Sequence, residues 1–138
     1  MQQQIEVPGE WASIATLMAF ADRVEAYLPL SPDQSYLLRL VIEEIATNIV
    51  KYGYAEPPRE TIQLVCACRG EILYITIRDR GQPFDPRDHP DPDLSPDTVT
   101  ERAIGGLGLF FVRQFADHVD YHHDPASRWN ELTVTKGP

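Results

Sequence analysis

Apolar residues recur along the first part of the chain with two different periods. Residues 3–7 alternate between polar and apolar side chains, which predicts a short strand. Across residues 11–28, and again across 37–49, the apolar side chains stand at helical spacing, with a proline-marked restart at residues 31–33. The pattern therefore predicts one strand followed by two helices, the second of which ends near Gly53.

The second half of the chain opens with two runs of residues that favour strands. Residues 61–68 and 71–78 are joined around residues 69–70, which predicts an antiparallel hairpin. Residues 80–104 then hold five prolines, too many for a helix or a central strand. Because structureless stretches of this length inside compact domains tend to be lids or binding loops, we expect a lid at about residues 82–105.

The last third of the chain predicts one more helix and two more strands. Apolar residues stand at helical spacing from Gly106 onward, and residues 119–121 and 132–135 have strand-like composition. The element order favours an α+β fold, a two-layer α/β sandwich in which helices cover one face of a mixed, mostly antiparallel sheet. A length of 138 residues suits one domain, so we expect residues 1–138 to fold as a single unit.

The charge of the chain restricts its partners. A formal net charge of −9, with no cluster of Lys and Arg, argues against nucleic acid as a direct partner. The same charge does not exclude a nucleotide, since backbone N–H groups, a helix N-terminus and Mg²⁺ can hold phosphates locally.

Cysteine usage and hydropathy indicate the compartment. Cys66 and Cys68 stand two apart in a strand-like run, at a separation unsuited to a mutual disulfide, which favours buried thiols over a metal or redox role. No stretch approaches about 18 uninterrupted apolar residues, and the first residues lack the pattern of a secretory signal. We therefore expect a cytoplasmic protein with no membrane segment.

Three short signals stand in order on this framework, and the first is Glu44 with Asn48. These residues are four apart on the second helix and share one face of it. The carboxylate can accept a proton from a hydroxyl or water, and the amide oxygen can ligate Mg²⁺. Lys51 is within reach of a terminal phosphate, whereas Glu43 lies about 100° round the helix and faces elsewhere. Taken alone, the pair favours a solvated polar edge of an amphipathic helix.

The second signal is Asp79 at the end of a strand, followed by Gly81. A carboxylate at a sheet edge can accept a hydrogen bond from an exocyclic amine such as that of adenine, and a glycine lets the ring approach the backbone. Pro83 and Phe84 would add an apolar wall. Taken alone, the segment is also typical of a turn that closes a strand.

The third signal is a glycine cluster, Gly105, Gly106 and Gly108, where the next helix should begin. Such glycines expose N–H groups that suit anionic phosphates. The spacing is not that of a P-loop, which needs Lys-Ser/Thr after its final glycine, nor that of the Rossmann fingerprint, which directly follows a strand. A flexible lid hinge remains the alternative.

Taken together and in this order, the three signals resemble the N-box and the two glycine boxes of the Bergerat-fold (GHKL) ATPase superfamily, over about residues 36–136. Within that superfamily, residues 47–54 and 106–112 look most like the anti-sigma-factor serine/threonine kinases of bacterial partner-switching systems. Many of those kinases have histidine where this chain has Tyr52, a departure that leaves the base and metal positions intact.

The resemblance implies a role for each signal. Glu44 would be the catalytic base for a serine of the partner, Asn48 the Mg²⁺ ligand and Asp79 the reader of adenine. Thr133 or Thr135 on the last strand would support the adenine end. The implied ATP-binding residues are Asn48, Lys51, Asp79, Gly81, Pro83, Phe84, Gly105, Gly106, Leu107, Gly108, Leu109, Thr133 and, as a contact of the γ-phosphate, Arg102.

The resemblance also implies a function. It indicates an ATP- and Mg²⁺-dependent protein serine kinase and anti-sigma-type regulator of transcription, with an anti-anti-sigma protein and a sigma factor as partners and with a homodimer as the common assembly. A histidine kinase is disfavoured, because the histidines fall in the lid or late in the chain: His89, His118, His122 and His123. The alternatives are a nucleotide-responsive protein-binding switch without kinase activity and a fold that has lost its nucleotide.

Overall fold

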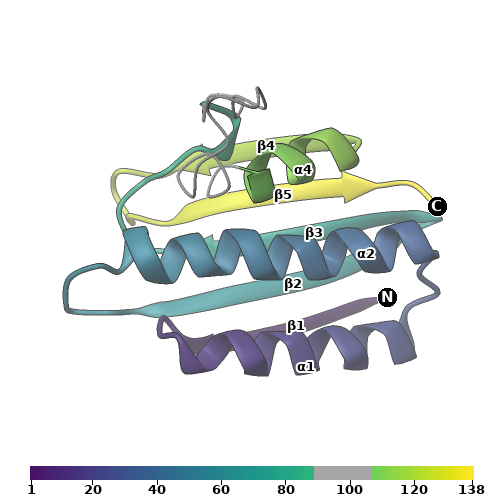
Figure 1. The fold of residues 1–138 in the computed structure, drawn as a ribbon, viewed down its shortest axis with the longest axis horizontal. Coiled ribbons are helices and arrows are strands. Elements are labelled where there is room, and N and C mark those ends of the chain that lie inside the picture. The colour runs from purple at the N-terminus through teal and green to yellow at the C-terminus, as the bar shows by residue number, and fades with distance from the viewer. Residues whose placement is uncertain (89–106) are drawn as a thin grey trace, which may run out of the picture.

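The computed structural model describes residues 1–88 and 107–138, which form two layers (Figure 1). A five-stranded sheet has the strand order β1-β2-β3-β5-β4, and helices cover one face of it. The expected α+β two-layer sandwich is confirmed. In chain order the strands and the longer helices are β1 (Gln2–Pro8), α1 (Ala12–Tyr27), α2 (Pro32–Val41), β2 (Thr61–Arg69), β3 (Ile72–Asp79), α4 (Leu107–Phe115), β4 (His118–His123) and β5 (Asn130–Lys136).

The sheet of the described residues is antiparallel at all four of its strand pairings. This differs from the mixed sheet that the element order predicts. β4 does run in the same direction as β3, as expected for two strands connected through a helix, but β5 lies between them and pairs with both. Because β5 lies between them, the parallel strands β3 and β4 are not neighbours in the sheet.

The second helix of the chain is longer than α2 itself. α2 continues into two π-helical segments, η1 (Ile42–Ala46) and η2 (Ile49–Gly53). It begins at a capping box, in which the Ser31 hydroxyl accepts from the Gln34 N–H and the Gln34 side chain accepts from the Ser31 N–H. The predicted start and end of the helix agree with the structure. The π-helical bonding is a difference, and it widens the turn in a way common at functional sites.

The core lies between the helices and the sheet. Leu17 of α1, Leu38 of α2 and Ile75 of β3 are among its fully buried side chains. Cys66 belongs to it as well, and burial raises the pKa of its thiol to about 12. Cys68 is partly buried, and both thiols are free. No helix within the two described ranges is long and apolar enough to cross a membrane.

The chain leaves β3 in an irregular segment that ends in a short 3-10 helix, η3 (Pro86–Asp88). This segment is the first part of the expected lid. Residues 89–105, the remainder of that lid, lie outside the described residues.

Candidate functional site

A pocket lies at the end of β3, on the side of the sheet that the helices cover. Its walls come from parts of the chain that are far apart in sequence: the π-helical part of the long helix, the end of β3 with the segment after it, and the hairpin of β4 and β5. Most of its walls are apolar, with a few polar groups, as is typical of sites for small organic ligands. The lining residues are Ile45, Asn48, Ile49, Gly53, Ile77, Asp79, Gln82, Phe84, Pro86, Tyr121, Asn130 and Leu132.

Asp79 is the buried acceptor of this pocket. Its side chain is only 6% exposed, and its Oδ2 accepts hydrogen bonds from the Gly81 N–H at 2.8 Å and from Asn130 Nδ2 at 3.2 Å. Burial raises the pKa of the carboxyl, and these two hydrogen bonds offset part of the rise. The strand end therefore presents a fixed carboxylate to whatever enters the pocket.

Gly81 is needed because two backbone segments touch at this position. A Cβ at Gly81 would lie 2.6 Å from the carbonyl carbon and oxygen of Gly53, the last residue of η2. The next residue strengthens the contact, since the Gln82 N–H donates to the Gly53 oxygen at 2.9 Å. The sequence indicates a glycine that makes room for a ring. The structure shows that it makes room for the end of the helix, and the approach of a ring stays a prediction.

Tyr54, which the sequence did not single out, ties the same region together. Its buried hydroxyl donates to the Thr61 carbonyl at 2.9 Å and accepts from the Arg80 N–H at 2.8 Å. Burial raises the pKa of this phenol to about 12. The ring packs against Gly9, where a Cβ would collide with it. One side chain thus joins the helix end, the start of β2 and the turn after β3.

The structure brings Asn48 to the pocket but leaves Lys51 outside it. Asn48 lies between the two π-helical segments, is half-buried and lines the pocket. Lys51 is exposed, and its Nζ lies 5.1 Å from the centre of the Tyr52 ring. Lys51 therefore does not line the pocket, and its contact with a phosphate stays a prediction.

Glu44 lies just beyond the pocket, against the start of α4. A Cβ at Gly108 would overlap the Glu44 carboxylate, so this helix approaches the glutamate as closely as a glycine allows. Burial raises the pKa of Glu44, and the charge of Glu43 raises it further. Glu43 itself is exposed, in line with its predicted position round the helix. Chemically, Glu44 is a partly buried proton acceptor next to a helix N-terminus.

The segment after β3 contributes part of the predicted apolar wall. Phe84 lines the pocket although it is 42% exposed, whereas the exposed Pro83 is absent from the lining. Pro86, which the sequence analysis did not name as a site residue, is buried and lines the pocket in its place.

Thr133 lies on the other face of the sheet from the pocket. Its hydroxyl is 3.1 Å from that of Thr76 on β3. Side chains alternate along a strand, so Asn130 and Leu132 of β5 face the helices while Thr133 and Thr135 face away. Asn130, not a threonine, thus occupies the place beside Asp79. The two strands make this arrangement in register, since Asp79 and Asn130 are directly paired.

The remaining predicted site residues fall at or beyond the edge of the described chain. Arg102, Gly105 and Gly106 lie outside the described residues. Leu107 begins α4, and Leu109 is buried in the core.

The fold and the pocket together define the class of protein. A buried carboxylate at a strand end, an amide on the facing helix and a glutamate beneath the next helix, in an α+β sandwich, are the parts of a Bergerat-type ATPase domain. The family model of the histidine kinase-like ATPase domain matches residues 7–136, and the chain belongs to this family. Membership in this family implies the use of ATP.

Particular relatives narrow the comparison. The chain is similar to "Serine-protein kinase RsbW" of Bacillus subtilis, at 24% identity over 120 residues that cover 84% of this chain and 74% of the relative. It is similar to "Anti-sigma F factor" of Anoxybacillus flavithermus, at 25% identity over 121 residues that cover 88% and 77%. Among solved structures, the Acinetobacter baumannii histidine kinase AdeS shares 12% identity at a TM-score of 0.48, covering 98% of this chain and 68% of that one. The predicted resemblance to GHKL proteins of the anti-sigma kinase type is confirmed.

Proposed function

We propose that this chain is an ATP- and Mg²⁺-dependent protein serine kinase and anti-sigma-type regulator, whose substrate is a small anti-anti-sigma protein. The position of Glu44 carries the proposal. It lies one turn of helix from Asn48, which lines the nucleotide pocket, and it contacts Gly108 at the start of α4. The names of two relatives, a serine-protein kinase and an anti-sigma F factor, support the same activity.

The pocket suits an adenine ring. Ile49, Ile77 and Leu132 supply apolar surface, and the buried Asp79 supplies an acceptor for the exocyclic amine. A nucleotide seated in this way would extend its phosphates along the long helix towards Glu44.

Mg²⁺ fits this site as an ion held largely by the phosphates. The described residues contain no group of three or more His, Cys, Asp and Glu side chains able to hold a metal by themselves. Mg²⁺ at nucleotide sites commonly keeps several waters and takes only one or two protein oxygens. Asn48 would supply one such oxygen. When bound, Mg²⁺ neutralises charge that develops on the phosphates during transfer.

In the proposed reaction the serine oxygen of the substrate forms a bond to the γ-phosphorus. The bond between that phosphorus and the β–γ bridging oxygen breaks, and ADP leaves. Glu44 takes the hydroxyl proton. A carboxylate accepts a proton only while ionised, and the raised pKa of Glu44 brings its basicity nearer to that needed close to neutral pH.

The rest of the proposal concerns assembly. A sigma factor would be the second protein partner, the chain would form a homodimer, and it would act in the cytoplasm. Residues 1–138 would fold as one domain whose lid, at about residues 82–105, closes over the phosphates with Arg102, Gly105 and Gly106. Lys51 would reach a phosphate only after its side chain turns away from Tyr52.

Incubation with γ-labelled ATP, Mg²⁺ and the anti-anti-sigma protein encoded in the same genome tests the proposal. We expect label on a serine of that protein and none in the presence of EDTA. A stable complex that forms without label would instead show a nucleotide-responsive switch. A chain that binds neither ATP nor ADP by calorimetry would contradict both.

A further inference from the structure

Asn130 is the centre of a hydrogen-bonded cluster at the end of the sheet. It is paired with Asp79 across β3 and β5 and is only 3% exposed. Its Nδ2 donates to Asp79 Oδ2 at 3.2 Å and to the Gly81 carbonyl at 3.0 Å. Its Oδ1 accepts from the Tyr121 hydroxyl at 3.1 Å and lies 2.6 Å from Nδ1 of His123. All the donors and lone pairs of this amide are thus engaged.

The cluster permits one orientation of the amide. If the side chain of Asn130 were turned over, its oxygen would face a carboxylate and a carbonyl, which are both acceptors. The observed orientation requires that Nδ1 of His123 carry a proton and donate it to Asn130 Oδ1. His123 and Tyr121 therefore decide which atom of Asn130 faces Asp79.

The orientation of Asn130 in turn fixes the Asp79 carboxylate. Within the described parts of the chain, the hydrogen bonds to this side chain, from Gly81 and Asn130, both end on Oδ2. Oδ1 is left as an acceptor for a ligand in the pocket that Asp79 lines. Since both donors stabilise the ionised form, the cluster also opposes protonation of a buried acid.

The same cluster reaches the apolar wall of the pocket. The backbone of Phe84 hydrogen-bonds to the Tyr121 hydroxyl, and both residues line the pocket. Tyr121 therefore joins the acceptor end of the pocket to the segment that follows β3.

We propose that Asn130 is a specificity-determining residue of the nucleotide site and that His123 is its positioning residue. Through Asn130, His123 holds Asp79 as an ionised acceptor with one oxygen presented, which selects a base carrying an amine over one carrying a carbonyl at the same place. This inference rests on the proposed function, because it assumes that a purine nucleotide occupies the pocket. Its chemical consequence is preference for adenine over guanine.

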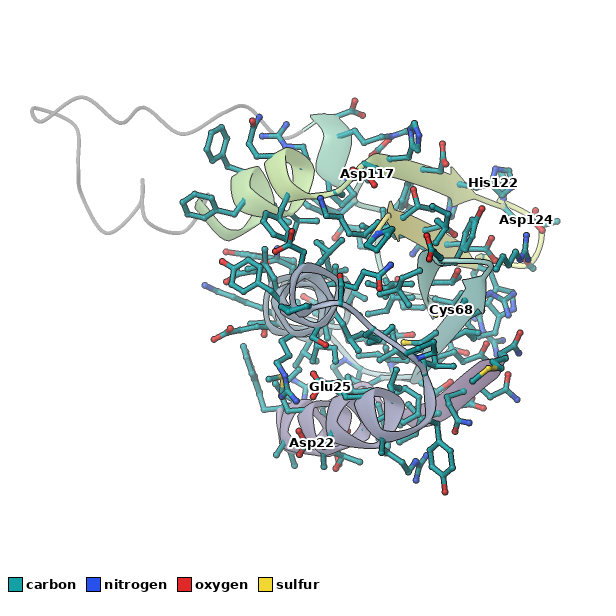
Figure 2. The ribbon with its side chains drawn as sticks, turned by 90° about the vertical axis from the view of Figure 1, so that its right-hand side faces the viewer. Asp22, Glu25, Cys68, Asp117, His122 and Asp124 are labelled. Atoms are coloured by element: carbon teal, nitrogen blue, oxygen red, sulfur yellow. The ribbon has the colours of Figure 1, made fainter. Side chains whose placement is uncertain are left out.

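Calorimetric titrations of ADP and of GDP into the full chain test the inference, with three variants of β4. His123→Ala removes the donor to Asn130. His123→Asn restores it, because the asparagine Nδ2 can occupy the place of the histidine Nδ1. His122→Ala is the matched control, since His122 is exposed, pairs with Glu131 and lies near Asp124 at the hairpin of β4 and β5 (Figure 2).

We expect His123→Ala to weaken ADP binding about fivefold, the effect of one hydrogen bond, and to narrow the ratio of ADP to GDP affinity. His123→Asn should return the ratio of ADP to GDP affinity most of the way to its wild-type value, and His122→Ala should leave the ratio unchanged. A purely structural role for His123 would weaken both nucleotides equally and leave the ratio unchanged, which would overturn the inference while the proposed function stands. A wild-type chain that binds neither nucleotide would overturn both.

Discussion

Two ends of the site are built in different ways: the base end, where we propose that the adenine base binds, and the transfer end, where we propose that the phosphoryl group is transferred. At the base end, Asp79 and Asn130 are paired across two strands, buried, and held by hydrogen bonds that leave little freedom. At the transfer end, Glu44 meets Gly108 across two helices, and the contact is made by the end of a flexible side chain. Strand pairing therefore fixes the geometry of the base end, and helix packing fixes the geometry of the transfer end. Substitutions at the base end should therefore affect nucleotide binding and folding, and substitutions at the transfer end should affect the rate of phosphoryl transfer.

The largest effect should come from the transfer end. Glu44→Gln keeps the shape of the side chain but removes its ability to take a proton, so phosphoryl transfer to the serine should fall about 10²- to 10⁴-fold. The affinity for ADP should stay within twofold of wild type, which is a change in binding free energy of about 0.4 kcal/mol or less. Glu43→Gln is the matched control, because Glu43 is exposed next to it. Transfer rates are measured with labelled ATP. Equal losses of transfer rate in the two variants would exclude Glu44 as the catalytic base.

The base end should show the next largest effect. Asp79→Asn replaces an ionised acceptor by an amide and should weaken ADP binding about 10²-fold. Its thermal stability at pH 7 should equal or exceed that of wild type, because burial already disfavours the ionised carboxylate. Parallel calorimetry and thermal melts measure the two quantities. A variant that binds ADP normally would exclude Asp79 as the reader of the base.

Two glycines offer a direct comparison of the ends. A Cβ at Gly81 meets the rigid backbone of Gly53, so Gly81→Ala should lower the free energy of unfolding by about 2 kcal/mol. A Cβ at Gly108 meets the Glu44 side chain, which can swing away, so Gly108→Ala should cost under about 1 kcal/mol while slowing transfer about tenfold or more. Urea unfolding and transfer assays on both variants measure these effects. Equal losses of stability in the two variants would contradict the predicted difference.

The smallest effect concerns the pH dependence of stability. The pKa of Glu44 is raised in the fold above its ordinary 4.5, so between those two values the native state binds more protons than the unfolded state. Stability from this group is full below the ordinary pKa and is lost as pH rises through the raised one. Glu44→Gln should thus raise the melting temperature by a few degrees at most at pH 7 and by nothing below pH 4.5. A pH-independent difference would contradict the shift.

The sequence predicted the features that depend on local spacing. The position of Glu44 and Asn48 on one helix, Asp79 at a strand end and the start of the helix behind Ser31 follow from neighbours within a turn or two. Such features could be predicted because helical and strand periods are fixed by the backbone.

Features that depend on register and on long-range contact could not be predicted. Thr133 and Asn130 are both polar residues of the last strand, and only the pairing of β5 with β3 shows which faces the pocket. For Gly81 the sequence suggested room for a ring or a turn, and the close approach of the Gly53 backbone could be found only in the fold. Tyr121 and His123 meet Asn130 only through the pairing of β4 with β5.

The most direct test of the account is one calorimetric experiment, in which ADP with Mg²⁺ is titrated into Glu44→Gln and into Asp79→Asn under the same conditions. We predict that Glu44→Gln binds ADP as wild type does and that Asp79→Asn binds ADP about 10²-fold more weakly. Loss of binding in Glu44→Gln, or normal binding in Asp79→Asn, would contradict the separation of a base-reading end from a transfer end.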